Sequence, residues 1–253
     1  MSLFKKILIS GIIYLVFLLV LLPAKTALWM IPLPPQVQLS GIDGSIWSGE
    51  AASATFDNRQ FEQIHWDINP WALAIGQLSV DVKIGSKATA FSTKGHVVLS
   101  TAGISMNDIN IESNNAFLIG NTQLPFRTKV AGDVSLFIKD FVQGIPICEQ
   151  LNGKLFLHKL QVNNQFGDFP LGEIEVGLAC NDGQLVLNAD EKHNKLGISG
   201  SVLLGENNQY RLQAKIKPTA EQPEKIRNSL SFLGQPDSQG YYKINYQGRL
   251  PKI

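Results

Sequence analysis

The sequence predicts a mainly β protein, in which a single N-terminal transmembrane helix precedes a large, curved antiparallel sheet in meander order, with one short C-terminal helix. Three observations predict this class. A long apolar run, Ile7–Leu22, lies near the N-terminus. After it, apolar and polar residues alternate with a period of two in many short segments, as in strands with one buried face. Turn sequences such as Asn181–Gly183 separate neighbouring segments and favour hairpins.

Residues 1–27 are predicted to form a short cytoplasmic tail and a transmembrane anchor. Lys5 and Lys6 precede the apolar run, and the low-charge residues on either side extend it toward the roughly 20 residues that a span requires. Positive charge before the run places the N-terminus in the cytoplasm and the rest of the chain outside. A cleaved secretory signal is the alternative, although Lys25 lies where cleavage after Ala27 requires a small residue.

The exported part divides into a proline-rich linker, residues 28–36, and a β-rich domain, residues 37–253. Proline fixes φ and removes a backbone donor, so the linker is expected to be stiff and extended. One helix is predicted over Thr219–Leu233 and one helical turn over residues 71–76. The alternation is compatible with both a closed barrel and an open, U-shaped sheet. Strands are expected at residues 36–40, 63–68, 78–85, 104–112, 132–139, 154–162, 173–180, 183–188, 199–204, 209–217 and 241–250.

Charge and motif content exclude several classes of function. Charged residues make up 17% of the chain, against about 25% in an average protein. Without Lys5 and Lys6, the exported part has 22 − 2 = 20 basic and 21 acidic residues, which argues against a nucleic-acid partner. The four histidines lack metal-ligand spacing, and neither a Gly-x-Ser-x-Gly elbow nor a phosphate-binding loop occurs. We therefore predict no catalytic, cofactor-binding or metal-binding residues and no enzyme, although an enzyme with its site on loops remains an alternative.

Cys148 and Cys180 enclose 31 residues of the exported part. In an oxidising compartment, two exported cysteines favour one structural disulfide. Free thiols, a redox pair and a metal site are the alternatives, but neither Cys-x-x-Cys spacing nor a histidine at ligand spacing supports the last two.

Three tryptophans, Trp47, Trp66 and Trp71, lie within 25 residues of one another. Large rings either fill a core and fix strand register or form an anchor for another protein, because tryptophan is enriched in interface hot spots. We expect Trp47 and Trp66 to belong to the core. Trp71 follows Pro70 at the end of an element and is the better interface candidate.

Several segments resemble the type II secretion system protein N family (general secretion pathway protein N). The segment Gly41–Gly49 is similar to its Gly-Thr/Ser-hydrophobic-Trp-x-Gly box, with Ser45 where threonine is commoner, and Ile64–Leu73 is similar to its Trp strand with a Pro-Trp turn. The family's paired cysteines match Cys148 and the Cys180 of Leu178–Gly183, and its closing pattern matches Leu230–Gly234 followed by Gly240–Ile244. The resemblance runs from the anchor to the C-terminus.

The resemblance implies an accessory inner-membrane component of the machine that moves folded exoproteins across the outer membrane. It also implies partners among the inner-membrane platform or secretin components, and it supplies no catalytic residues. The expected location is the inner membrane, single-pass, with the bulk of the chain in the periplasm. One-faced strands favour an alternative function, a periplasm-facing carrier or bridge whose hydrophobic groove holds a lipid or acyl chain.

Overall fold

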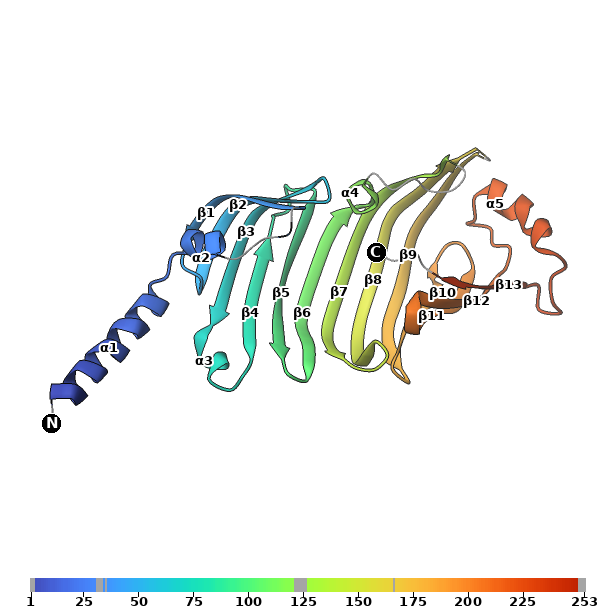
Figure 1. Ribbon diagram of the computed structural model, residues 1–253. Helices are drawn as coiled ribbons and strands as arrows, with labels where there is room; N and C mark the ends of the chain where they lie inside the picture. Colours follow the sequence, from blue (N-terminus) through green and yellow to red (C-terminus); the bar gives the residue numbers. More distant parts are fainter. Residues whose placement is uncertain (1–2, 31–33, 35, 121–126, 166, 250–253) are drawn as a thin grey trace.

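In the computed structural model, one open antiparallel sheet of 13 strands runs the length of the molecule (Figure 1). The structure describes residues 3–30, 34, 36–120, 127–165 and 167–249. The strand order in the sheet is the order in the sequence, from β1 to β13. The two end strands do not pair with each other, so the sheet is an open trough rather than a closed barrel.

Burial alternates along Gln209–Ile216 and most of Arg59–Asn69, as the sequence predicts, whereas all residues of Ile198–Leu204 are half-buried. Most strands are longer than the predicted segments. Their bounds are β1 Val37–Gly44, β2 Ser48–Phe56, β3 Arg59–Asn69, β4 Leu78–Ile84, β5 Phe91–Ser100, β6 Gly103–Asn114, β7 Lys129–Gln143, β8 Cys148–Asn164, β9 Gly167–Asn181, β10 Gln184–Asn194, β11 Ile198–Leu204, β12 Gln209–Ile216 and β13 Tyr242–Arg249. The helices are α1 Leu3–Val20, α2 Ala24–Met30, α3 Pro70–Leu73, α4 Asn115–Ile119 and α5 Glu224–Ser229, with short 3₁₀ turns η2 Glu206–Asn208 and η3 Leu230–Leu233.

Three elements lie where no strand or helix was predicted, namely β2, β5 and α4. The predicted helix over residues 219–233 is shorter than expected, because Gln222 is buried and donates to the carbonyl oxygens of Leu196 and Lys217. These bonds hold the residues before Pro223 in a loop, and the helix begins at Glu224. Helix α2 includes the first three residues of the predicted linker, and most of the rest of that linker lies outside the described residues.

Helix α1 projects away from the sheet (Figure 1). Its first turns contain Lys5 and Lys6, and it ends at Val20, three residues before Pro23. Within the part of the chain that the structure describes, no helix combines the length and apolar character needed to cross a membrane. The predicted transmembrane helix is therefore not confirmed.

The sheet curves where residues are inserted into its ladders. The register shifts between Leu157 and Leu160 of β8, and Lys159 between them has a φ of 49°. Such a β-bulge bends a strand and increases its local twist. Glu173 of β9 stabilises this bulge, because its carboxylate accepts from the Lys159 backbone N–H at 2.9 Å and is bonded to His158 Nδ1 at 2.7 Å.

A disulfide joins the start of β8 to the end of β9. Cys148 and Cys180 are bonded, their Cα atoms lie 6.1 Å apart, and Cys148 is fully buried. The predicted pairing is thereby confirmed. The bond closes a loop that contains both strands at the middle of the sheet, where the ladders are longest.

We expect the double substitution Cys148→Ala/Cys180→Ala to lower the free energy of unfolding of the full chain by about 3–4 kcal/mol, because it releases a loop of this length in the unfolded state. Denaturant titration of the purified chain, with dithiothreitol-treated wild type as the matched control, measures this. An unchanged midpoint in both samples would contradict the expectation.

The Glu173 carboxylate is expected to make stability depend on pH. The Lys159 N–H and then His158 hold its pKa below the ordinary value of 4.5. A lowered pKa in the folded state gives stability that is present above about pH 4.5 and disappears as pH falls through the lowered value. The difference in unfolding midpoint between wild type and Glu173→Gln is therefore expected to be largest near neutral pH and to shrink in acid. Asp190→Asn, on β10, is the control, and equal acid sensitivity of both variants would contradict this role for Glu173.

Candidate binding surface

One face of the sheet carries a row from β1 to β13 in which every residue but Thr93 is apolar. Each residue in the row is the direct cross-strand partner of the next, and the row contains no charged and no aromatic side chain. We call these thirteen residues the trough floor: Ile42, Ala51, Ile64, Ile84, Thr93, Ile111, Leu136, Leu155, Val176, Ala189, Gly200, Ala214 and Ile244.

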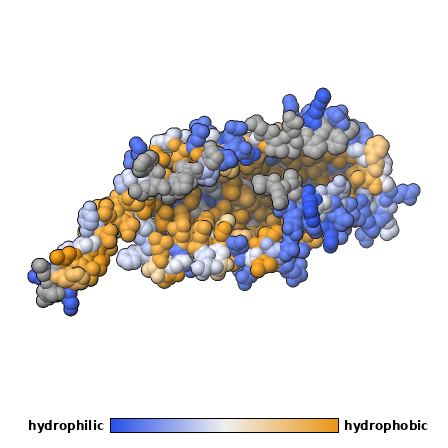
Figure 2. All heavy atoms as spheres, in the orientation of Figure 1, coloured by the Kyte–Doolittle hydropathy of each residue, from blue (hydrophilic) through white to orange (hydrophobic). Residues whose placement is uncertain are grey.

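The trough floor is not covered by a second layer within the described residues. Of its thirteen members only Ala51 is buried, and the other twelve are half-buried. Figure 2 shows hydrophobic residues lining a hollow that is bordered by hydrophilic ones. A parallel apolar row lies beside the floor from β6 to β12: Ile109, Ile138, Gly153, Leu178, Leu187, Val202 and Leu212. The apolar face is thus a continuous surface rather than a set of isolated side chains.

A small aromatic cluster closes one rim of the trough. Phe117 of α4 contacts Phe61 and Phe91, with ring centroids 5.3 and 5.6 Å apart, and the last two rings meet edge to face at 5.0 Å. Asn114 caps α4 by accepting from the Phe117 N–H at 2.7 Å. Arg59 donates to the carbonyl oxygens of Leu118 and Ile119 at the other end of the helix. The cluster holds α4 against β3 and β5 at the rim of the trough and does not cover the trough floor.

The opposite face of the sheet is polar, and three histidines on it each lie against a carboxylate. His65 Nδ1 lies 3.3 Å from Glu50, and His158 is paired with Glu173 as described above. Within the described residues, no group of three or more His, Cys, Asp or Glu side chains is placed to hold a metal ion. These side-chain pairs connect neighbouring strands on the polar face.

The third histidine belongs to an arrangement that sequence reasoning missed. Ser79 Oγ lies 3.2 Å from His96 Nε2, and His96 Nδ1 lies 2.9 Å from Asp81 Oδ1. This is the order of groups in a Ser-His-Asp triad. Ser79 is only 9% exposed, however, and β3 and β5 pair with the strand on both sides of it. Backbone donors for an oxyanion are therefore engaged in the ladders, and the arrangement serves to orient His96.

The two tryptophans expected in the core form a junction between α1 and the first hairpin. Trp47 Nε1 donates to the Leu19 carbonyl at 2.8 Å, and the Ile46 N–H donates to the Leu22 carbonyl at 3.1 Å. Trp66 Nε1 donates back to the Ile46 carbonyl at 3.2 Å. Both rings are half-buried, so they serve packing and connection here.

Glycine and serine shape the turn that carries Trp47. Ser45 Oγ accepts from the backbone N–H groups of Trp47 and Ser48 at 3.2 and 3.1 Å. Gly44 has a φ of +83°, which favours glycine. A Cβ at Gly49 would lie 2.5 Å from the Trp66 ring and 2.8 Å from the Asp43 carbonyl oxygen. The turn therefore requires these small residues.

Trp71 lies at the surface, unlike the other two. It is 83% exposed in α3, and Ile75 just after the helix is 73% exposed. Asn69 caps the helix by accepting from the Trp71 N–H at 3.0 Å. The Ile68 N–H donates to the Trp47 carbonyl, so α3 follows directly on the α1 junction. A docking role for Trp71 stays a prediction.

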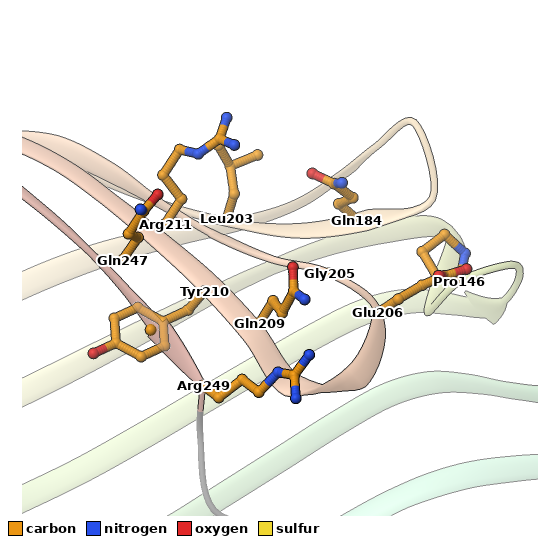
Figure 3. A pocket seen from close by; sticks show the side chains of 11 residues that line it. Pro146, Gln184, Leu203, Gly205, Glu206, Gln209, Tyr210, Arg211, Gln247 and Arg249 are labelled. Carbon is orange, nitrogen blue, oxygen red and sulfur yellow. The ribbon is translucent and has the colours of Figure 1, made fainter.

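A second hollow opens at the C-terminal end of the sheet (Figure 3). Its volume is about 920 Å³, and it is lined by side chains of β10 to β13 and by Pro146. Arg211 of β12 and Arg249 of β13 lie apart from each other in this view (Figure 3). They do not converge on one position, as recognition of a single anion would require.

The fold and its surfaces define a class: a single-layer antiparallel β-trough with one polar face and one uncovered apolar face. The family model for type II secretion system (T2SS) protein N matches residues 35–245, and the chain belongs to this family. The chain is 34% identical to the type II secretion system protein N of Aeromonas hydrophila, over 97% of this chain and 99% of the relative. It is 31% identical to that of Vibrio cholerae, over 98% and 96%. No solved structure matches the chain. Membership confirms the resemblance and supports a role in type II secretion.

We expect Gly49→Ala to destabilise the α1 junction by about 1–3 kcal/mol, because the added methyl group overlaps the Trp66 ring and two backbone carbonyls. Gly177→Ala is the matched control, since the nearest atom to its Cβ is the Asn188 oxygen at 3.8 Å. Limited proteolysis of the full chain between α1 and β3 measures the difference. Equal cleavage rates in the two variants would refute the assignment of a packing role to Gly49.

Proposed function

We propose that this chain is an accessory inner-membrane component of the type II secretion system that acts by contacting other secretion proteins. In this proposal it supports the export of folded exoproteins across the outer membrane and performs no catalysis. Family membership supports the secretion role. The observation that carries the mode of action is the last strand of the sheet, β13, which pairs only with β12 among the described residues.

An unpaired edge strand presents free backbone N–H and C=O groups, to which a partner can add a strand. At the other end of the sheet α2 contacts β1, and η3 contacts β13, but among the described residues no strand pairs with the outer side of β13. The free edge at β13 therefore fits an extended segment of a platform or secretin component. Tyr246 on this strand is 64% exposed and offers an aromatic contact beside the edge.

The proposed location is the inner membrane, with the N-terminus in the cytoplasm and the sheet in the periplasm. Large apolar side chains of α1, from Phe4 to Val20, are 44–75% exposed in the isolated chain. Exposing so much apolar surface to water is costly. Lys5 and Lys6 at the start of the helix favour cytoplasmic placement of that end.

An in-frame deletion of the gene is expected to leave exoproteins in the periplasm, and the full chain supplied in trans is expected to restore secretion. In the same cells, a photo-reactive amino acid at Asn245 on β13 should crosslink to another secretion component, because Asn245 lies at the free edge. Lys94 on β5 is the matched control, because it lies in the same polar row in the middle of the sheet.

Membranes from these cells are washed with alkaline carbonate, and the chain is expected to remain with the inner membrane. Normal secretion by the deletion strain would overturn the secretion role. Equal crosslinking at Asn245 and Lys94 would overturn the edge as the docking site, and release of the chain by carbonate would overturn the anchor.

A further inference from the structure

We propose that the trough floor binds the acyl chains of membrane phospholipids. This inference goes beyond the role in secretion and stands on the geometry of the apolar face. The floor is a row of mainly aliphatic residues, twelve of them half-buried, that no second layer covers within the described chain. An apolar surface of this extent is stabilised by an apolar occupant.

The chemistry of the floor favours hydrocarbon over protein. Residues that dominate protein interfaces are tryptophan, tyrosine and arginine, and none of these occurs in the floor. In the neighbouring rows, the aromatic residues Trp66, Phe91 and Tyr246 lie on β3, β5 and β13, and none lies between β6 and β12. From β6 to β12, the floor offers aliphatic contact without hydrogen-bonding side chains, which suits a methylene chain.

Backbone hydrogen bonding also favours a hydrocarbon chain over an extended peptide as the occupant of the floor. The strands that form the floor are paired on both sides from β2 to β12, so the floor offers no free backbone N–H or C=O to an extended peptide. A peptide laid along it would bury its own polar backbone without partners, which costs several kcal/mol per group. A second copy fits poorly too, because two concave faces meet at their rims and leave the space between them empty.

The dimensions of the floor suit more than one acyl chain. Twelve steps between adjacent strands at about 4.8 Å each give a floor of about 58 Å. One leaflet of a bilayer contributes about half of a 30 Å hydrocarbon core. The floor is therefore several times longer than a single acyl chain and can hold chains in succession along its length.

The N-terminal end of the trough begins at the apolar helix. Trp47 and Ile46, which lie in the turn between β1 and β2, donate to the carbonyl oxygens of Leu19 in the last turn of α1 and of Leu22 just after it. Ile42 and Ala51, the first two residues of the floor, lie on the same two strands. A lipid that contacts the exposed side chains of α1 therefore lies beside the first strands of the trough. This step, which identifies membrane phospholipid as the source, rests on the proposed location of α1 in the membrane.

Photo-crosslinking of the full chain in cells tests this proposal. A benzophenone amino acid is placed at Leu136, in the floor, or at Phe137, the next residue on β7. Phe137 is the matched control, because it is 42% exposed and apolar but lies on the opposite face. We expect phospholipid adducts, identified by mass spectrometry of the purified chain, at Leu136 and about tenfold fewer at Phe137.

Two charge variants give a second measurement on β8. Leu155→Glu places a carboxylate in the floor and is expected to lower the amount of phospholipid that co-purifies by about tenfold. Lys154→Glu, one residue away on the polar face, removes the Lys154–Glu175 ion pair but is expected to leave the amount of co-purifying phospholipid unchanged. Formation of the Cys148–Cys180 disulfide, scored by mobility on non-reducing gels, shows that each variant has folded.

The outcomes of these two experiments test lipid binding separately from the proposed role in secretion. Phospholipid adducts confined to Leu136 support it even in a strain whose secretion is normal. Equal adduct yields at Leu136 and Phe137, adducts to a polypeptide at Leu136, or the absence of adducts from both would overturn it. If Leu155→Glu fails to fold, the comparison of Leu136 with Phe137 decides alone.

Discussion

The whole structure depends on the register of one sheet. Side chains along a strand alternate between faces, so a slip of one residue in any ladder would move that strand's apolar side chains to the polar face. In a two-layer domain, a second layer would oppose such a slip by packing against one face. Here the solvent-accessible area is 17,057 Å², against about 11,000 Å² for a compact protein of this mass. Part of the excess belongs to α1, and much of the rest to the uncovered trough.

Register must therefore be held by local features instead of by a core. The disulfide fixes β8 against β9, and Glu173 secures the bulge at Lys159. At the N-terminal end, Trp66 packs against Gly49 and bonds to Ile46, so the first hairpin and β3 hold each other in place. The residues that carry the family resemblance are largely these register-fixing ones. In this chain, the tryptophans, glycines and paired cysteines of those segments thus have a structural role in the sheet.

The sequence predicted eleven of the strands because their alternation is strong, and it missed two for a physical reason. Strand β2, Ser48–Phe56, has alanine and serine where other strands have large aliphatic residues, and β5 is interrupted by a bulge at Gly95.

Other features of the structure could not be predicted from the alternation of apolar and polar residues. A barrel differs from a trough in whether β1 pairs with β13. That pairing is decided by twist and bulges, which do not change the alternation. The Ser79–His96–Asp81 arrangement was also out of reach, because it depends on which residue of β5 faces Asp81. The disulfide was predictable because the expected oxidising compartment favours pairing of two cysteines.

An uncovered apolar face links the stability of the fold to whatever occupies it. Any ligand that binds the folded sheet and not the unfolded chain stabilises it by mass action. For a two-layer domain this contribution is small beside that of the core. In the trough, only nine apolar residues of the described chain are buried: Ala24, Ala51, Ala72, Val134, Cys148, Leu160, Leu196, Ile216 and Leu230. An occupant of the floor would therefore supply a large share of the burial that other proteins obtain from their own second layer, and a filled trough would be the more stable state.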